Sequence, residues 1–411
     1  MNETTQPMTN SAKLGMLFAA SVAIAIGGTH SHVLGAMVKP LGDSYGWSRG
    51  DIAFALTISS FMHPFTNVAI GLLADRYPVR RIVLPGIVAF VLGTASLGLV
   101  TKEIWTWYAA YVLFTIAGSG ISAILFTKLV VEHFSKRRGL ALASALAGAG
   151  ILVSTIPHIV LAMETMVGVK GVYPLIAACA FVLLIIPCWL FLPREESISH
   201  LALRNLPASV TEPKGGWRDV ILSPVFQRLG IAFLLIGSCI GTFIVHLQPM
   251  LADAGLSRAE AASVALFVGP AMIVGRLGTG MLYDIFPTRL VTAVAFSLPA
   301  FACLWLINFP LDFLSASALA ILIGLGMGSE TDAVAYLSSR YFGTRRYGLV
   351  FGTLISLYGI GIGLASWLVG RAFDSTGSYD AVLIVLTGGV GIAILLLLSL
   401  GSPPPLVDDK H

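Results

Sequence analysis

Long stretches without charged side chains constrain the fold of this 411-residue chain more than any other feature. Twelve stretches of about 20 residues or more are apolar and almost free of Asp, Glu, Lys and Arg, and about 20 such residues let a helix cross a bilayer. They cover residues 14–38, 52–74, 82–101, 104–127, 139–163, 171–193, 229–252, 261–283, 290–311, 313–338, 347–370 and 381–400. Only 11% of the residues are charged, which excludes a water-soluble globular domain. We therefore expect an all-α membrane protein with twelve transmembrane helices.

The order of these stretches predicts the domain organisation. Six stretches are followed by a segment rich in charge, proline and serine, and then by six more stretches. We expect a tail at 1–13, a six-helix bundle at 14–193, a central loop at 194–227, a second six-helix bundle at 228–400 and a tail at 401–411. Most Lys and Arg residues between the stretches fall on the side of both tails and the central loop, and cations of short loops stay in the cytoplasm. Both termini are therefore expected to be cytoplasmic.

An internal repeat relates the two halves of the chain. Residues recur at an offset of 208 to 209 positions, so that Asp75 corresponds to Asp284 and Arg80 to Arg289. Two similarly oriented six-helix halves are typical of secondary transporters. We therefore expect two pseudo-symmetric six-helix bundles.

A first motif, from Gly71 to Arg81, ends the second apolar stretch with a glycine, an aspartate and a cluster of arginines. It resembles the cytoplasmic signature of the major facilitator superfamily, Gly-x-x-x-Asp-Arg-x-x-x-Arg-Arg, and a weaker copy runs from Gly280 to Arg289. The resemblance implies the major facilitator fold and alternating access, in which charge pairs at the cytoplasmic ends lock the outward-open state. The residues that it assigns to gating or structure are Gly71, Asp75, Arg76, Arg80, Gly280, Asp284 and Arg289, joined by Arg137 and Arg138 of a second motif.

The second motif is the segment HFSKRRGLALASALAG, from His133 to Gly148. It resembles the signature of the fifth span in the monocarboxylate transporter family, a group that includes bacterial organic-anion carriers and oxalate/formate exchangers. His133 stands where that signature has tyrosine, and the acidic, tryptophan-rich signature before the first span is missing. Cations at a cytoplasmic helix start and a helix of small residues also have a plain topological and packing explanation. The resemblance implies a carrier of small organic anions in a bacterial cytoplasmic membrane.

Arg276 is the one cation well inside an expected span, where a charge is costly. Its planar guanidinium can bind a carboxylate through two parallel hydrogen bonds and stays charged at working pH. Compared with the monocarboxylate transporter family that the chain resembles, Arg276 coincides with the arginine of the eighth span that binds the substrate carboxylate. Met272 stands where the eukaryotic carriers of that family have an aspartate. The alternative is a structural ion pair with Glu330.

Lys39 is a second candidate for anion binding, at the outer end of the first span. It follows His32 by seven residues, so both lie on one helix face. Monocarboxylate transporters have a lysine in a comparable place that first captures the anion. Alternatively, Lys39 extends to the outer interface and has no role in binding.

A coupled proton requires a titratable group inside the bundle. The candidates are His32, since histidine titrates near neutrality, and the two carboxylates of the tenth span, Glu330 and Asp332. Tyr358 precedes a glycine-rich stretch that either lines the binding site or packs against another helix.

The function that these features predict is secondary active transport of a small organic anion, a mono- or dicarboxylate, by proton symport and alternating access. Anion exchange, proton-driven export of drugs or other hydrophobic compounds, and a non-transporting membrane sensor remain as alternatives. No phosphate-binding loop, zinc-protease motif or nucleophile elbow occurs, so we expect no enzyme activity, cofactor or metal. The expected partners are the carboxylate, protons and the lipid bilayer, without nucleic acid, for a monomeric carrier.

Overall fold

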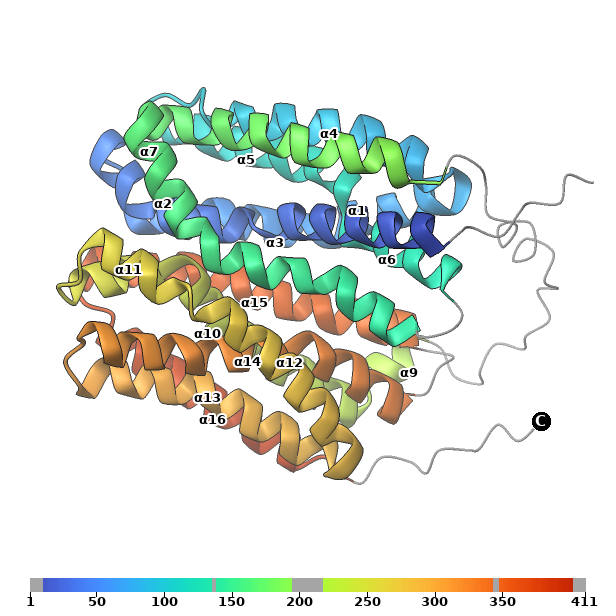
Figure 1. Cartoon of the computed structure of the whole chain (residues 1–411). Coiled ribbons are helices and arrows are strands. Elements are labelled where there is room, and N and C mark those ends of the chain that lie inside the picture. The colour runs from blue at the N-terminus through green and yellow to red at the C-terminus, as the bar shows by residue number, and fades with distance from the viewer. Residues whose placement is uncertain (1–9, 135–137, 194–216, 343–346, 402–411) are drawn as a thin grey trace, which may run out of the picture. The chain divides into compact units, whose positions relative to one another are not determined.

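The computed structural model describes residues 10–134, 138–193, 217–342 and 347–401 (Figure 1). These residues form α-helices and one short 3-10 helix, and the described part of the chain contains no strand. The expectation of an all-α protein is therefore confirmed.

Figure 1 shows the elements, which are numbered in chain order. They are α1 (Asn10–Gly28), α2 (His30–Tyr45), α3 (Arg49–Arg76), α4 (Val79–Ser96), α5 (Ile104–Gly118), η1 (Ser119–Ile121), α6 (Ala123–His133), α7 (Arg138–Phe191), α9 (Trp217–Ile221), α10 (Pro224–Asp253), α11 (Arg258–Ala265), α12 (Val268–Ile285), α13 (Thr288–Asn308), α14 (Phe313–Phe342), α15 (Tyr347–Thr376) and α16 (Asp380–Leu398).

Eleven helical segments of the described chain are long and apolar enough to cross a membrane. One of them belongs to the 54-residue α7, whose backbone leaves the helical conformation at Gly168, with φ 71° and ψ 172°. At about 1.5 Å per residue, α7 is far longer than the ~30 Å hydrocarbon layer, so the kink divides it into two spans. The twelve expected spans are therefore all present as helix.

Three spans are interrupted. The first breaks at Thr29, between α1 and α2, where the Thr29 hydroxyl donates to the carbonyl of Ile26 at 3.0 Å. The fourth passes through η1 to Ser122, and the eighth breaks between α11 and α12. Irregular backbone at membrane depth is tolerated where protein buries it or where it lines a water-filled cavity. Each break is therefore a candidate place for a water-filled cavity or a bound solute.

The helices gather into two compact units. Unit 1 comprises Met1–His30, Met62–Leu152 and Met163–Ala208, and unit 2 comprises Ser31–Phe61, Val153–Ala162 and Ser209–His411. In unit 1, α4 packs on α5, and in unit 2, α13 packs on α16 and α10 on α15 (Figure 1). The division of the chain into bundles at 14–193 and 228–400 stays a prediction.

The internal repeat has a counterpart in the hydrogen bonds. In unit 1, Nη1 of Arg80 donates to the carbonyl of Leu192, just past α7, at 2.7 Å. In unit 2, Nη1 of Arg289 donates to the carbonyl of Leu400, just past α16, also at 2.7 Å. Each arginine thus satisfies a carbonyl that the last helix of its half leaves free. The two motif arginines have the same structural role in the two halves.

Candidate functional site

Arg276, on α12, lies at the centre of a polar cluster in unit 2. Its Nε lies 3.4 Å from Oδ2 of Asp332, on α14, and 3.4 Å from the carbonyl of Gly328. The side chains of Arg276 and Asp332 keep 22% and 34% of their surface exposed. The pair is therefore only partly buried by protein.

The terminal nitrogens of Arg276 are open. Both close contacts of the guanidinium use Nε, and among the described residues neither Nη1 nor Nη2 has a hydrogen-bond or ion-pair partner. These two nitrogens form one edge of the planar fork that binds a carboxylate through two hydrogen bonds. The contacts to Asp332 and Gly328 therefore leave the Nη1/Nη2 edge of the guanidinium without a partner among the described residues.

Glu330 has a different partner. It is 3% exposed, and the hydroxyl of Tyr358, on α15, donates a hydrogen bond to its Oε2. Its Oε1 is buried and has no hydrogen-bond partner within the described chain. Of the two acidic side chains of α14, Asp332 thus forms the ion pair with Arg276, and Glu330 bonds to Tyr358.

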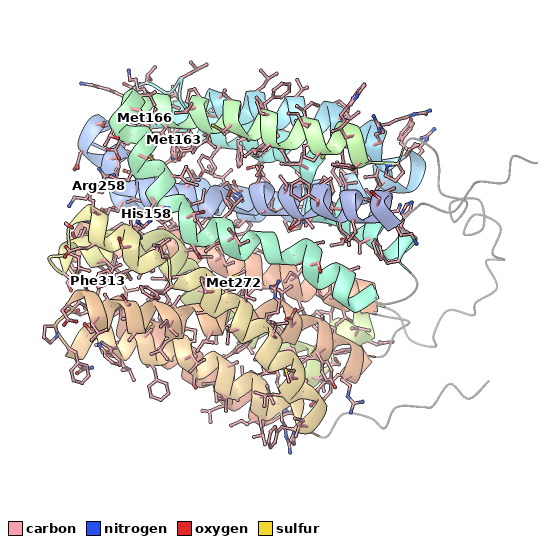
Figure 2. The ribbon with its side chains drawn as sticks, in the orientation of Figure 1. His158, Met163, Met166, Arg258, Met272 and Phe313 are labelled. Atoms are coloured by element: carbon pink, nitrogen blue, oxygen red, sulfur yellow. The ribbon has the colours of Figure 1, made fainter. Side chains whose placement is uncertain are left out.

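Glycines let the helices around this cluster approach closely. A Cβ on Gly328 would collide with the carbonyl oxygen of Met272 and the backbone nitrogen of Arg276, so α14 and α12 touch at this point. Met272 is labelled in Figure 2, one turn before Arg276. In the same way, a Cβ on Gly237 of α10 would collide with the carbonyl of Tyr358. Close backbone contact through small residues is the usual way to pack helices in a bilayer, and here it fixes the positions of Arg276 and Tyr358.

Aromatic residues continue the cluster along α12 and α14. The rings of Tyr283 and Tyr336 stack with their centroids 4.8 Å apart, and the Tyr336 hydroxyl donates to the carbonyl of Tyr283 at 3.5 Å. The corresponding contact of the first half is made by Lys128, whose Nζ donates to the carbonyl of Ala74 at 2.6 Å. The sequence patterns did not single out Tyr283, although its place directly before Asp284 of the repeated motif was a signal.

His32 and Lys39 lie away from this cluster, on α2. His32 lines a small cavity of about 30 Å³ with Phe243 and Gln248. Its Nε2 is buried without a hydrogen-bond partner in the described residues, and its Nδ1 lies 3.5 Å from the hydroxyl of Ser31. Lys39 is exposed and lines a second cavity of about 30 Å³. The structure therefore brings together Arg276, Asp332, Glu330 and Tyr358, and leaves His32 and Lys39 elsewhere in unit 2.

The described motif residues lie in helices. Gly71 lies in α3, Arg76 ends that helix with its guanidinium 5.9 Å from the ring of Tyr77, and Gly280 lies in α12. Arg137 lies outside the described residues, and the side chains of Asp75, Arg138 and Asp284 lie outside the described part as well. The gating roles of these residues stay predictions.

The described residues contain no group of three or more His, Cys, Asp or Glu side chains that could hold a metal ion. The Arg276 cluster combines one guanidinium, two carboxyl groups and the hydroxyl of Tyr358.

Comparisons with known proteins agree with the fold. Residues 16–366 match the family model described as Major Facilitator Superfamily. The rat (Rattus norvegicus) protein Monocarboxylate transporter 13 is 25% identical over 356 residues, which cover 84% of this chain and 79% of that protein.

Two solved structures have the same fold at low sequence identity. The nucleoside transporter NupG superposes with a TM-score of 0.75 at 10% identity, covering 94% of this chain and 99% of that one. A bacterial homologue of the human lysosomal transporter Spinster, in an inward-facing and unoccupied conformation, gives a TM-score of 0.67 at 14% identity and covers 95% of each chain.

Proposed function

Since the chain belongs to the major facilitator superfamily, a family of multi-pass membrane transporters and not of enzymes, we propose that it carries a small organic anion, a mono- or dicarboxylate. The proposed mechanism is proton symport by alternating access. The relative named for monocarboxylate transport supports this substrate class.

The open edge of Arg276 is the observation that carries the proposal. A guanidinium inside an apolar bundle is costly unless a partner holds it. Asp332 contacts only Nε, at 3.4 Å, so the two terminal nitrogens remain available for a carboxylate. An anion bound there completes the hydrogen bonding of the fork and neutralises the charge.

Asp332 supplies the coupling to protons in this proposal. A second carboxylate beside Arg276 would share its charge, and two like charges near one cation favour protonation of one of them. Asp332 therefore takes up a proton as the anion binds, and anion and proton cross together. The eukaryotic carriers that the chain resembles have an aspartate in place of Met272; here the carboxylate comes to the same guanidinium from α14.

The remaining candidates receive supporting roles. Glu330 is a second proton acceptor, since its Oε1 lacks a partner among the described residues and Tyr358 holds its other oxygen. Lys39 and His32 attract the anion from the outer side. The carrier is proposed to work as a monomer in a bacterial cytoplasmic membrane, with both termini in the cytoplasm.

A ligand screen of the purified full chain tests the substrate class. A ligand at 100 times its Kd stabilises the folded state by about 2.7 kcal/mol, which a thermal-shift assay detects. We expect members of a carboxylic acid library to raise the melting temperature of the wild type and of Arg218→Gln, a surface control on α9, but not of Arg276→Gln. Stabilisation by hydrophobic cations instead of acids would contradict the proposal and favour drug export.

A further inference from the structure

Unit 1 contains a cavity of about 340 Å³ whose lining includes polar side chains. A water molecule occupies about 30 Å³ in the liquid, so the cavity has room for several. Its lining includes His30 and Gly28, on either side of the break at Thr29, and Ser119 and Ser122, at the break between α5 and α6. Both helix interruptions of unit 1 therefore border this cavity.

Two histidines face each other in its wall. The rings of His30 and His63 have centroids 6.0 Å apart and an interplanar angle of 76°, an edge-to-face arrangement. Nδ1 of His30 lies 3.3 Å from the carbonyl of Gly27, which fixes one nitrogen of that ring. The ring of Phe114 packs on His30 with centroids 5.3 Å apart. The geometry holds the two imidazoles as a pair at the cavity surface.

Asn67 adds an amide beside the pair. It follows His63 by four residues on α3, and residues at this spacing are neighbours on a helix face. Within the described chain, neither the ring nitrogens of His63 nor the amide of Asn67 have a hydrogen-bond partner. Polar groups at membrane depth need water or a ligand when protein does not satisfy them. The cavity provides the space for such a partner.

The charge of this cavity depends on the histidine pair alone. Its described lining, which comes from α1 to α7 and η1, contains no Asp, Glu, Lys or Arg. The other polar groups in it are hydroxyls and the Asn67 amide, which do not titrate in the physiological range. His30 and His63 are thus the titratable groups that face one another here.

We propose that His63 and His30 form a proton-binding site that holds one proton at a time. The first proton is stabilised by the neutral neighbouring ring, by cavity water and by the amide oxygen of Asn67. A second proton would put two positive rings 6.0 Å apart with no acidic side chain in the described lining, and like charges oppose this. A hydronium ion in the cavity water gives up the proton: one of its O–H bonds breaks, an N–H bond forms on a ring nitrogen, and a neutral water molecule remains. The site adds a protonation step to the proposed transport. Its role in transport rests on the proposed function.

Site-resolved titration of the purified full chain tests the pair without any solute. The exchange of the imidazole C2 hydrogen depends on protonation and is followed for each histidine by mass spectrometry across pH 5 to 8. We expect the protonated fractions of His63 and His30 to rise together across this range and to add up to no more than one. His246 is the internal control and should show no step, because its Nε2 bonds to the carbonyl of Ser366 at 2.8 Å and its Nδ1 to the Tyr379 hydroxyl at 3.3 Å. Absence of a step at His63 would overturn the proposal.

Variants test the coupling and the role of Asn67. In His30→Gln, the midpoint of His63 should change, because its neighbour no longer shares the proton. In Asn67→Asp, a carboxylate one turn away should move the midpoint of His63 upward by about one pH unit. Asn308→Asp, at the end of α13, is the matched control and should leave it unchanged. A His63 midpoint that stays the same in His30→Gln would refute the pair, whereas retained acid binding by Arg276→Gln would refute only the proposed function.

Discussion

At the scale of single residues, the proposed anion site depends on the pairing around Arg276. A charged side chain near the centre of a membrane helix costs about 2.5 to 3.5 kcal/mol on insertion scales. Oδ2 of Asp332 lies 3.4 Å from Nε of Arg276 and offsets part of this cost. The hydroxyl of Tyr358 donates a hydrogen bond to one oxygen of Glu330. An anion that arrives at Arg276 therefore competes with one carboxylate, that of Asp332.

Removing the carboxylate of Asp332 should separate anion binding from proton coupling. In proteoliposomes, a gradient of one pH unit coupled to one proton supports about tenfold accumulation, since one unit corresponds to 1.36 kcal/mol. We expect Asp332→Asn to lose this accumulation and to keep exchange of internal for external anion, because Arg276 remains. Asp219→Asn, on the exposed face of α9, is the control. Tenfold accumulation by Asp332→Asn would show that the proton is coupled elsewhere.

Sequence alone identified the members of the Arg276 cluster but not their pairing. Charges in apolar stretches marked Arg276, Glu330 and Asp332, and the structure brings all three together with Tyr358. The structural alternative paired Arg276 with Glu330, whereas the ion-pair partner of Arg276 in the structure is Asp332. The two acidic residues point about 200° apart on their helix, and only packing fixes the rotation of α14.

The histidine cavity shows the same limit. His63 and Asn67 were visible in the sequence as polar residues four apart, whereas the candidates singled out for proton coupling were His32, Glu330 and Asp332. Which polar face borders a cavity depends on how several helices pack, and one sequence does not fix that. The i, i+4 spacing of two polar residues inside a span was the signal that could have found them.

At the scale of elements, close helix crossings determine the geometry of the site. The crossing of α12 and α14 depends on Gly328, which meets α12 at Met272 and Arg276, and on Gly275, which meets Leu325 of α14. Backbones that approach this closely leave no room for a side chain. The relative positions of Arg276 and Asp332 therefore depend on the two glycines of this crossing, Gly328 and Gly275.

Adding a single methyl group tests this crossing. Gly328→Ala should lower the stability by about 1 to 3 kcal/mol, the usual cost of overpacking, and should weaken anion binding, because α14 must shift away from α12. Gly278→Ala, on α12, is the control, since nothing lies within 4 Å of its added Cβ. Thermal unfolding and acid binding measure both effects. Equal melting temperatures of the two variants would contradict the packing argument.

The positions of the spans followed from the sequence, but their interruptions did not. Twelve apolar stretches were expected and appear as helix. The first was expected at 14–38, but the helices continue through Lys39 to Tyr45, with Pro40 inside α2. The breaks at Thr29 and at Ser119–Ser122 were also not expected. Hydropathy detects the length of an apolar run, whereas local hydrogen bonds and packing decide where a helix breaks.

At the scale of the whole molecule, a network around Arg49 holds distant parts of the sequence together within unit 2. Arg49, at the start of α3, donates to Asp253 of α10 at 2.6 and 3.0 Å and to the hydroxyl of Tyr379 at 2.7 Å. The backbone nitrogens of Arg49 and Gly50 donate to the carboxylate of Asp374, on α15, at 3.0 and 2.9 Å. This Arg49 network connects α3 to two helices of the second half and explains why residues 31–61 belong to unit 2.

In the proposed alternating access, such contacts break and reform. The Arg49 network should therefore stabilise one conformational state of the carrier. Arg49→Gln should destabilise the purified protein by about 1 kcal/mol, the scale of a partly exposed ion pair. The exchanged pair Arg49→Asp with Asp253→Arg should recover part of the loss, as measured by thermal unfolding. If the double variant is no more stable than Arg49→Asp or Asp253→Arg alone, this would contradict a direct ion pair between the two side chains.

The all-α, multi-span architecture could be predicted because the apolar stretches and the internal repeat are visible in the sequence. The equivalent contacts of Arg80 and Arg289 show the repeat in three dimensions. The identity of the solute could not be predicted, because it depends on the shape and chemistry of a cavity wall built from many helices.

Uptake of a radiolabelled carboxylate, chosen from the acids that stabilise the wild type, into proteoliposomes tests the central claim most directly. Wild-type chain and Arg218→Gln should accumulate the label when the outside is acidic. Arg276→Gln should reduce uptake to the level of protein-free vesicles while unfolding at a similar temperature, and Arg276→Lys should retain only a small part, because an ammonium cannot form the two parallel hydrogen bonds. Uptake by Arg276→Gln at the wild-type rate would contradict the account.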